Sequence, residues 1–212
     1  MHRLHAAKES VVSVVMRLKV VNRILSLLVL GLGLYLVGQP LYPAVKLAIT
    51  IWLNPQGGYP YASHLAEAAG VESSATPEGD RLVIPSIQVD GEIVTGSDPI
   101  ALDQGIWLRP QGATPDQKSN TVLAAHRYLY KAGPNTFYNL DKVTIGEQIA
   151  VFWEDREYNY RVTEINEVAA DATEVEEPTS TSVLTLYTCT PIWTASRRLV
   201  VKAELIGDYP RL

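Results

Sequence analysis

The single cysteine of the chain, Cys189, ends the apolar run Val-Leu-Thr-Leu-Tyr-Thr-Cys. One cysteine cannot form an intramolecular disulfide or a CxxC-type zinc site, so it is either a small buried hydrophobe or a reactive thiol. Thr190 and Pro191 follow directly, and the proline favours an exit from the β ladder into a loop. Loops on a rigid scaffold are frequent places for functional groups, which favours the reactive thiol.

A histidine with a similar setting is His126, which ends the run Thr-Val-Leu-Ala-Ala-His. His2 and His5 precede an apolar segment near the N-terminus, and His64 lies in a predicted spacer. An imidazole at the end of a buried strand is either a structural group with a hydrogen-bond partner or a proton shuttle. Taken alone, His126 does not decide between the two.

Arg197 and Arg198 open the next apolar run after Cys189, so strand, loop and strand predict a hairpin that brings an arginine near the cysteine. A guanidinium there favours a thiolate or donates to an oxyanion, whereas the structural alternative is an arginine that snorkels from a strand edge. Side chains alternate along a strand, so only one of the two points at the cysteine. A soft nucleophile, a proton shuttle and a charge stabiliser together indicate nucleophilic acyl transfer.

Short β runs separated by turns must position these residues. We expect an all-β fold: a closed or nearly closed antiparallel barrel of about 130 residues. Helical periodicity is confined to single turns around 99–104, 136–140 and 171–177. The predicted strands are Arg81–Val89, Asn120–Ala125, Glu147–Trp153, Glu157–Val168, Ser182–Thr188 and Arg198–Ile206.

The N-terminal part has a membrane signature. Residues 1–23 carry five basic side chains against one acidic, a local charge of +4, which leaves −9 for the rest. Residues 24–45 are uncharged and close to the roughly 20 residues that span a bilayer. We predict a cytoplasmic basic tail (1–23), a transmembrane anchor (24–53), a spacer (54–80) and an extracellular barrel domain (81–212), that is, a single-pass protein of the cell membrane. A cleaved signal peptide is the rival interpretation.

The composition and charge of the chain argue against some classes of partner and ligand. With 47% apolar and 19% charged residues the chain is not disordered, and a net charge of −5 argues against nucleic acid as a partner. Four acidic side chains between 171 and 177 have no EF-hand spacing, so a solvated loop is the better interpretation. We predict no metal and no cofactor. The four acidic residues between 171 and 177 are Asp171, Glu174, Glu176 and Glu177.

The segment Thr185–Pro191, Thr-Leu-Tyr-Thr-Cys-Thr-Pro, followed by Arg198-Leu-Val-Val, resembles the Thr-Leu-x-Thr-Cys signature and downstream strand arginine of sortases. Residues 82–90 are similar to the first core strand of that family, 120–127 to the strand that presents its histidine, and 137–147 to its short turn. The resemblance covers most of 82–206. It implies an eight-stranded β-barrel with short helices, preceded by a transmembrane helix.

It also implies a cysteine transpeptidase that cuts a C-terminal sorting motif, commonly Leu-Pro-x-Thr-Gly-like, on exported proteins and joins the new carboxyl end to an amine. That amine is a peptidoglycan stem peptide or a pilin lysine. Carried over by position, Cys189 attacks the carbonyl, His126 moves the proton and Arg198 binds the substrate or oxyanion, with Arg197 as the alternative.

The neighbours of these residues, Thr188, Thr190 and Ala125, are expected to bind substrate. Many relatives have glycine where this chain has Ala125, a change that adds a methyl group and removes no reacting group. The competing hypothesis is a membrane-tethered β-barrel binding module, or an inactive relative, in which Cys189 and His126 are structural. Hydrolysis of the same thioester is a further alternative.

Overall fold

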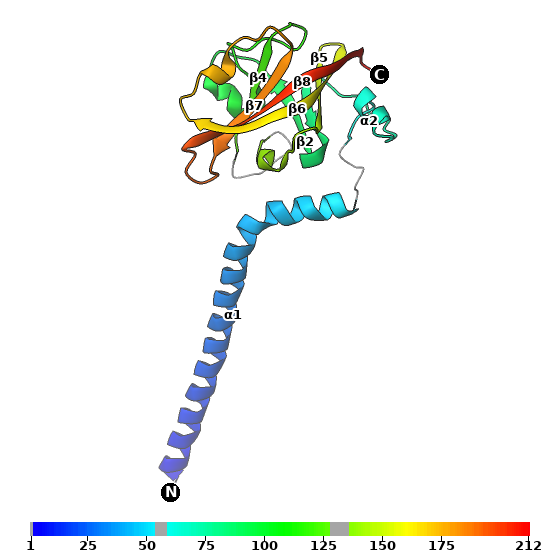
Figure 1. The fold of residues 1–212 in the computed structure, drawn as a ribbon. Coiled ribbons are helices and arrows are strands. Elements are labelled where there is room, and N and C mark those ends of the chain that lie inside the picture. Colours follow the sequence, from blue (N-terminus) through cyan, green and yellow to red (C-terminus); the bar gives the residue numbers. More distant parts are fainter. Residues whose placement is uncertain (1, 54–58, 128–135) are drawn as a thin grey trace. The chain divides into compact units, whose positions relative to one another are not determined.

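The computed structural model describes residues 2–53, 59–127 and 136–212. Within them, eight strands close into a barrel in the order β1-β2-β3-β4-β7-β8-β6-β5 (Figure 1). The strands are β1 (Arg81–Ile84), β2 (Val89–Val94), β3 (Ile106–Leu108), β4 (Asn120–Ala124), β5 (Gln148–Trp153), β6 (Arg156–Ala169), β7 (Val183–Thr190) and β8 (Arg197–Pro210). The helices are α1 (His2–Leu53), α2 (His64–Ala68) and the single 3₁₀ turns η1 (Pro85–Ile87), η2 (Pro99–Asp103), η3 (Leu140–Lys142) and η4 (Glu174–Glu176). The predicted all-β barrel with short helices is confirmed.

The run predicted as one strand, 81–89, is in fact the whole of β1, the turn η1 and the first residue of β2. Pro85 begins the intervening turn η1, and Gln88 ends it in the left-handed conformation at φ 56°. The chain therefore reverses, and β1 and β2 pair antiparallel with Ile84 opposite Val89. Proline lacks the N–H that a continuous strand would need, which explains the break.

Two strand pairs differ from the antiparallel prediction: β2 with β3, and β4 with β7, are parallel. The 3₁₀ turn η2 lies in the connection that returns the chain to run beside β2, while β5 and β6 intervene between β4 and β7. Parallel neighbours need such long crossovers, which local periodicity does not reveal. The pairing matters for function because β4 and β7 end at the same rim of the barrel.

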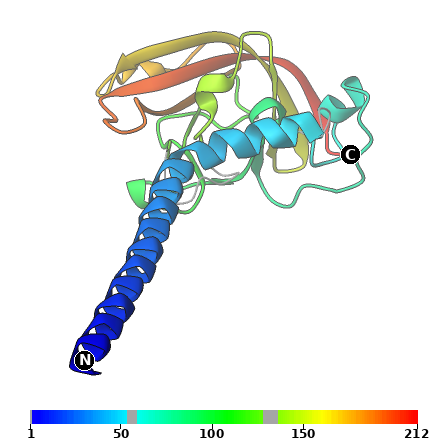
Figure 2. The same cartoon turned by 90° about the horizontal axis from the view of Figure 1, so that it is seen from below.

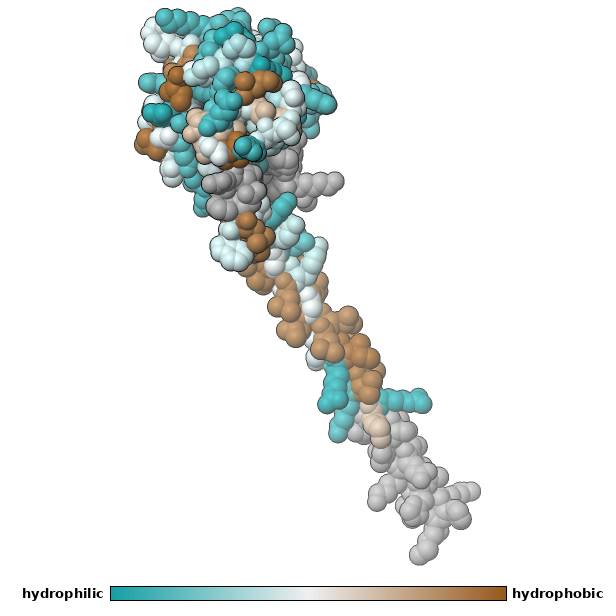
Figure 3. Space-filling view, turned by 90° about the vertical axis from the view of Figure 1, so that its right-hand side faces the viewer, coloured by the Kyte–Doolittle hydropathy of each residue, from teal (hydrophilic) through white to brown (hydrophobic). Residues whose placement is uncertain are grey.

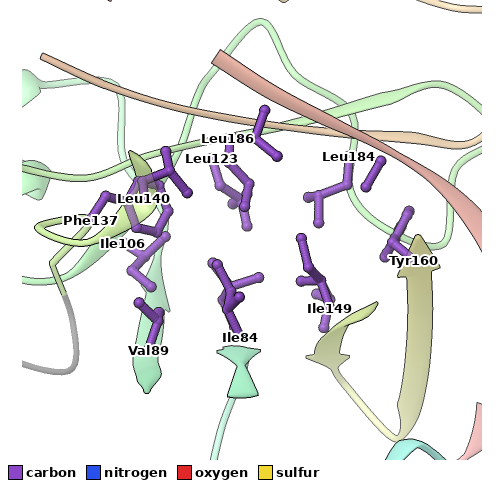
Figure 4. Packing of buried hydrophobic residues seen from close by; sticks show 14 of the residues in the cluster. Ile84, Val89, Ile106, Leu123, Phe137, Leu140, Ile149, Tyr160, Leu184 and Leu186 are labelled. Carbon is purple, nitrogen blue, oxygen red and sulfur yellow. The ribbon is translucent and has the colours of Figure 1, made fainter. Parts of the chain in front are cut away.

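The barrel interior is filled by alternate side chains of the strands. Phe137 and Leu140, from the turn that leads into η3, pack against them (Figure 4). Burying each large aliphatic side chain contributes about 1.5–3 kcal/mol, so this cluster is the main source of stability. Its fully buried members include Leu82, Ile84, Ile106, Leu123, Phe137, Leu140, Ile149, Tyr160, Leu184 and Leu186.

The two longest strands, β6 and β8, run side by side across one wall (Figure 2). They pair antiparallel, with register shifts at Asn159/Tyr160 and Val162/Glu164. β8 also pairs with β7 along the whole of β7. The start of β8 is thus fixed on both sides, which gives Arg198 a defined position.

Part of the segment expected as a spacer packs on the outside of the barrel. Leu65 of α2 joins Val83, Ala150 and Phe152 in a second apolar cluster. The fully buried carboxylate of Glu157 accepts the backbone N–H groups of His64 and Leu65 at 2.8 and 3.0 Å. The first five residues of the predicted spacer, 54–58, lie outside the described residues.

The N-terminal helix α1 contains the one described span that is long and apolar enough to cross a membrane, Met16–Gln39. Its apolar side chains form a brown stretch along the helix with hydrophilic side chains on its N-terminal side (Figure 3). Pro40 and Pro43 follow directly, and each lacks one backbone donor. Length and composition therefore fit the predicted anchor.

Candidate active site

Cys189 lies near the end of β7 and points away from the barrel interior. Leu184 and Leu186 face the core, and Thr188 shares their face. Tyr187 and Cys189 project from the opposite face because side chains alternate along a strand. The thiol is free and partly accessible. The backbone of Cys189 is held by the strand, while its thiol can be reached from solution.

The register of β7 and β8 distinguishes the two arginines. Arg198 lies directly opposite Cys189, and Arg197 lies opposite Thr190. Opposite residues of an antiparallel pair share one face of the sheet, so Arg198 is on the face of the thiol. Arg197 instead bonds Glu167, with Nη2 donating to its carbonyl at 2.7 Å and Nε 3.4 Å from Oε2. The register therefore favours Arg198 as the arginine of the site.

Arg198 has an anchored guanidinium. Its Nη1 donates to the carbonyls of Ala195 and Arg197 at 3.2 and 3.1 Å. A guanidinium carries five N–H donors, so donors remain on Nε and Nη2 for a ligand. Ala195 itself has a positive φ of 51°, and its N–H donates to the Pro191 carbonyl at 2.9 Å. These hydrogen bonds tie the loop between β7 and β8 to the start of β8.

His126 reaches the same rim through the parallel pairing of β4 and β7. Ala124 lies opposite Tyr187 in that register. Two residues further along each strand come His126 and Cys189, and a step of two residues returns a side chain to the same face. The backbone N–H of Ala125 donates to the Tyr187 carbonyl at 3.4 Å, so the pairing extends beyond Ala124. Imidazole and thiol therefore belong to neighbouring positions on one face.

Two further hydrogen bonds hold the end of β4. The Thr188 hydroxyl donates to the Ala125 carbonyl at 2.8 Å, and the Phe137 N–H donates to the His126 carbonyl at 2.9 Å. Thr188 and Ala125 are buried, and their contact joins the strand of the thiol to the strand of the imidazole. Thr190 is also buried, with its hydroxyl 3.4 Å from Glu167. Substrate binding by Thr188, Thr190 and Ala125 stays a prediction. In the structure these residues are buried, and the Thr188–Ala125 bond holds the ends of β4 and β7 together.

Arg127, which the sequence interpretation did not single out, fastens the segment after His126. Its buried guanidinium donates to the Tyr138 carbonyl through Nε at 2.8 Å and lies 2.9 Å from Asp141 through Nη2. A buried arginine with these partners ties the turn before η3 to the end of β4. Residues 128–135, between these anchors, lie outside the described residues.

The acidic stretch 171–177 is fastened to the outer face of β4 and β7. Glu176 Oε1 accepts from Arg109 Nε and from the Tyr187 hydroxyl, both at 2.7 Å. The Asn120 amide donates to the carbonyls of Val175 and Glu177 at 3.0 Å. Burial raises the pKa of Tyr187, and its bond to Glu176 raises it further, so the phenol stays a donor at neutral pH. The stretch predicted to be a solvated loop is therefore partly packed against the outer face of β4 and β7.

One carboxylate lies against the histidine ring. Asp103 Oδ1, at the end of η2, is 3.1 Å from His126 Nε2, and both side chains are accessible to water. Sequence reasoning expected a helical turn at 99–104 but not this contact. In the described residues, no cluster of three or more His, Cys, Asp or Glu side chains forms a metal site.

Comparison with known proteins decides the family. The family model described as the sortase domain matches residues 82–206, more than half of the 212 residues. The chain belongs to the sortase family. Sortases are cysteine enzymes of acyl transfer that act on proteins with sorting motifs and on amine acceptors, as the resemblance implied. The match begins in β1 and ends in β8, so it includes all or part of every strand of the barrel.

Individual sortases give the same result. Sortase A of Bacillus anthracis is 29% identical over 143 residues, which cover 68% of this chain and 67% of that protein. Matches to curated sortases span between 39% and 67% of their length. The group B Streptococcus Pilus Island 1 sortase C2 is 30% identical with a TM-score of 0.56, covering 69% of this chain and 82% of that one. Sortase E1 of Streptomyces coelicolor, with a tripeptide in the active site, is 25% identical with a TM-score of 0.55, covering 62% and 90%.

Proposed function

We propose that this sortase is a membrane-anchored transpeptidase that cleaves a Leu-Pro-x-Thr-Gly-like C-terminal sorting motif and transfers the acyl group to an amine. The observation that supports this most directly is the convergence of three groups at one rim: Cys189 and Arg198 as a cross-strand pair, and His126 at the end of the parallel neighbour. Nucleophile, charge stabiliser and proton shuttle then belong to one face.

In the first half-reaction the Cys189 thiolate attacks the carbonyl of the scissile peptide bond. As the C–N bond breaks, protonated His126 gives its proton to the leaving amine, and a thioester remains on sulfur. In the second half-reaction the incoming amine attacks the thioester and loses a proton to His126, while sulfur leaves as thiolate. His126 and Cys189 thus return to their starting states with no net consumption of protons.

Arg198 acts on the negative charge that develops at the attacked carbonyl. Its Nη1 is occupied by loop carbonyls, which fixes the plane of the guanidinium before substrate arrives. Donors that are oriented in advance stabilise a developing oxyanion without reorganisation during the reaction.

The anchor sets where the reaction takes place. The N-terminal end of the span Met16–Gln39 carries Arg17, Lys19 and Arg23, and basic flanks stay in the cytoplasm. We therefore place the N-terminus inside, the single helix in the membrane lipid and the barrel outside, where exported proteins emerge. A cleaved signal peptide is the alternative, and the apparent mass of the membrane-bound chain distinguishes the two.

The substrate is an exported protein with a C-terminal sorting motif, and the acceptor is a peptidoglycan stem peptide or a pilin lysine. A tripeptide occupies the active site of Sortase E1, which supports a short peptide as the ligand of this rim. The name of sortase C2 refers to a pilus island, which keeps the lysine acceptor among the candidates.

The test uses the full chain in detergent, a fluorogenic peptide library based on the sorting motif, and an amine such as hydroxylamine or triglycine. Wild type is expected to release the C-terminal fragment and to form the amine adduct, and Cys189→Ala to do neither. Cleavage without any adduct at saturating amine would make the chain a hydrolase. Equal cleavage by wild type and Cys189→Ala would refute the mechanism and favour the binding-module hypothesis.

A further inference from the structure

The contact between Asp103 and His126 is a feature that the proposed mechanism does not use. Asp103 Oδ1 lies 3.1 Å from Nε2, a hydrogen-bond distance. A neutral imidazole carries one N–H donor and one acceptor nitrogen, and an ionised carboxylate only accepts. A bond between Nε2 and this carboxylate therefore requires the proton on Nε2 and leaves the lone pair on Nδ1.

The turn that carries Asp103 is fixed at both ends. Asp98 caps η2 by accepting the Ile100 N–H at 2.9 Å, and the N–H groups of Gln104 and Gly105 donate to the Ala101 carbonyl. Ala101 is buried. The carboxylate is therefore presented by a single well-held turn, although its own side chain reaches into solvent.

The exit from this turn also allows little freedom. A Cβ at Gly105 would lie 2.7 Å from the Glu92 carbonyl oxygen, so only glycine fits where η2 leads into β3. The Trp107 indole donates to the Gly96 carbonyl at 2.9 Å, and Trp107 pairs with Ala124 of β4. The turn of Asp103 thus leads into β3, and His126 closely follows β4, the hydrogen-bonded neighbour of β3.

We propose that Asp103 is a positioning residue that holds His126 as the Nε2–H tautomer and so makes Nδ1 the nitrogen that exchanges protons with substrate. The inference deepens the proposed function and rests on it. In acylation the Nδ1 proton passes to the leaving amine, and in deacylation Nδ1 takes a proton from the incoming amine. Asp103 keeps its hydrogen bond to Nε2 in both steps and acts through the ring.

The test compares three variants of the full chain in detergent: Asp103→Ala, Asp103→Asn and Asp98→Asn. Asp98→Asn removes the same charge from the same turn, and asparagine caps as well as aspartate, so it is the matched control. Steady-state peptide cleavage gives kcat and KM. The nitrogen shifts of ¹⁵N-histidine, with His126 assigned by its loss in His126→Gln, report the tautomer.

We expect wild type and Asp98→Asn to show the Nε2–H pattern. Asp103→Ala should show mixed tautomers, with kcat about tenfold lower and KM within about twofold, because an oriented proton shuttle contributes through the reacting step alone. Asp103→Asn keeps an acceptor oxygen and should lie between the two. An intermediate kcat there is the rescue that a purely structural role would not give.

Two results overturn the inference: an Asp103→Ala spectrum and kcat equal to wild type, or a rise in KM with unchanged kcat, which would mean that Asp103 contacts substrate. Failure of wild type to cleave any peptide is a different outcome. It counts against the proposed function, while the nitrogen spectra still decide whether Asp103 sets the tautomer.

Discussion

The hydrogen bond from the Thr188 hydroxyl to the Ala125 carbonyl joins the strand of the thiol to the strand of the imidazole, and Thr188→Val removes it with little change in shape. The bond is 2.8 Å long and buried, whereas the adjacent backbone link from Ala125 to Tyr187 is 3.4 Å. The hydrogen bond of the hydroxyl is therefore the shorter of these two bonds between the strand ends. Its loss should let His126 shift relative to Cys189.

The expected cost follows from the burial of the carbonyl. A net hydrogen bond contributes about 1 kcal/mol, and a buried acceptor that loses its donor costs about 1–3 kcal/mol, so we expect a loss of about 2 kcal/mol. For a domain of this size that lowers Tm by roughly 4–8 °C. Because displacement of about 1 Å at a reacting group can cost up to about 100-fold, a smaller shift here should lower kcat about tenfold.

Thr185→Val is the matched control. The Thr185 hydroxyl is equally buried and donates to Asn120 Oδ1 at 2.7 Å, on the same two strands but near their N-terminal ends, away from Cys189 and His126. Thermal denaturation should show similar losses in both variants, and only Thr188→Val should lose kcat in peptide cleavage. Equal kcat values for the two variants would refute the claim that this bond sets the geometry of the site, and an unchanged Tm for Thr188→Val would refute the energetic argument.

Three other perturbations test neighbouring parts of the structure. Arg198→Ala should lower kcat by at least about 100-fold and Arg197→Ala by less than about threefold, since only the former faces the thiol; equal losses in steady-state assays would contradict the register argument. Arg127→Ala should cost about 2–3 kcal/mol in chemical denaturation because it removes a buried, charge-assisted contact, while Arg156→Ala, which breaks an exposed pair, should cost clearly less; the reverse order would contradict the burial argument. Burial raises the pKa of Tyr187 above 10.0, so the neutral phenol stabilises the folded protein fully below pH 10, and this stabilisation is lost as the pH rises towards the pKa of the folded state. Tyr187→Phe should therefore flatten the fall of Tm between pH 10 and 11. An unchanged slope of Tm against pH would contradict this role of the phenol.

Sequence patterns predicted the parts of the site that have local signals. Cys189 stands out because Thr190 and Pro191 end an apolar run, and the adjacent arginines open the next one. Alternation reduced the choice to one of two arginines, and the register then favoured Arg198. The barrel itself followed from short runs between turns, and its family from the motif around Cys189.

Contacts between residues far apart in the sequence have no local pattern that would predict them. Glu176 meets Arg109, 67 residues earlier, and its acidic neighbours favoured the interpretation of a solvated loop. Asp103 meets His126 because β3 pairs antiparallel with β4, so the residues before β3 and the residues after β4 lie at the same rim of the barrel. The three-residue strand β3 is too short for periodicity, so the segment that separates these partners could not be placed from the sequence.

The most direct test of the central claim is intact-protein mass spectrometry of the full chain after incubation with sorting-motif peptides and no added amine. Because Cys189 is the single cysteine, a thioester can form at one site only. The account predicts a mass gain equal to the acyl part of the peptide, absent in Cys189→Ala and reversed by hydroxylamine. Turnover of peptide with no adduct on wild type, or the same adduct on Cys189→Ala, would contradict it.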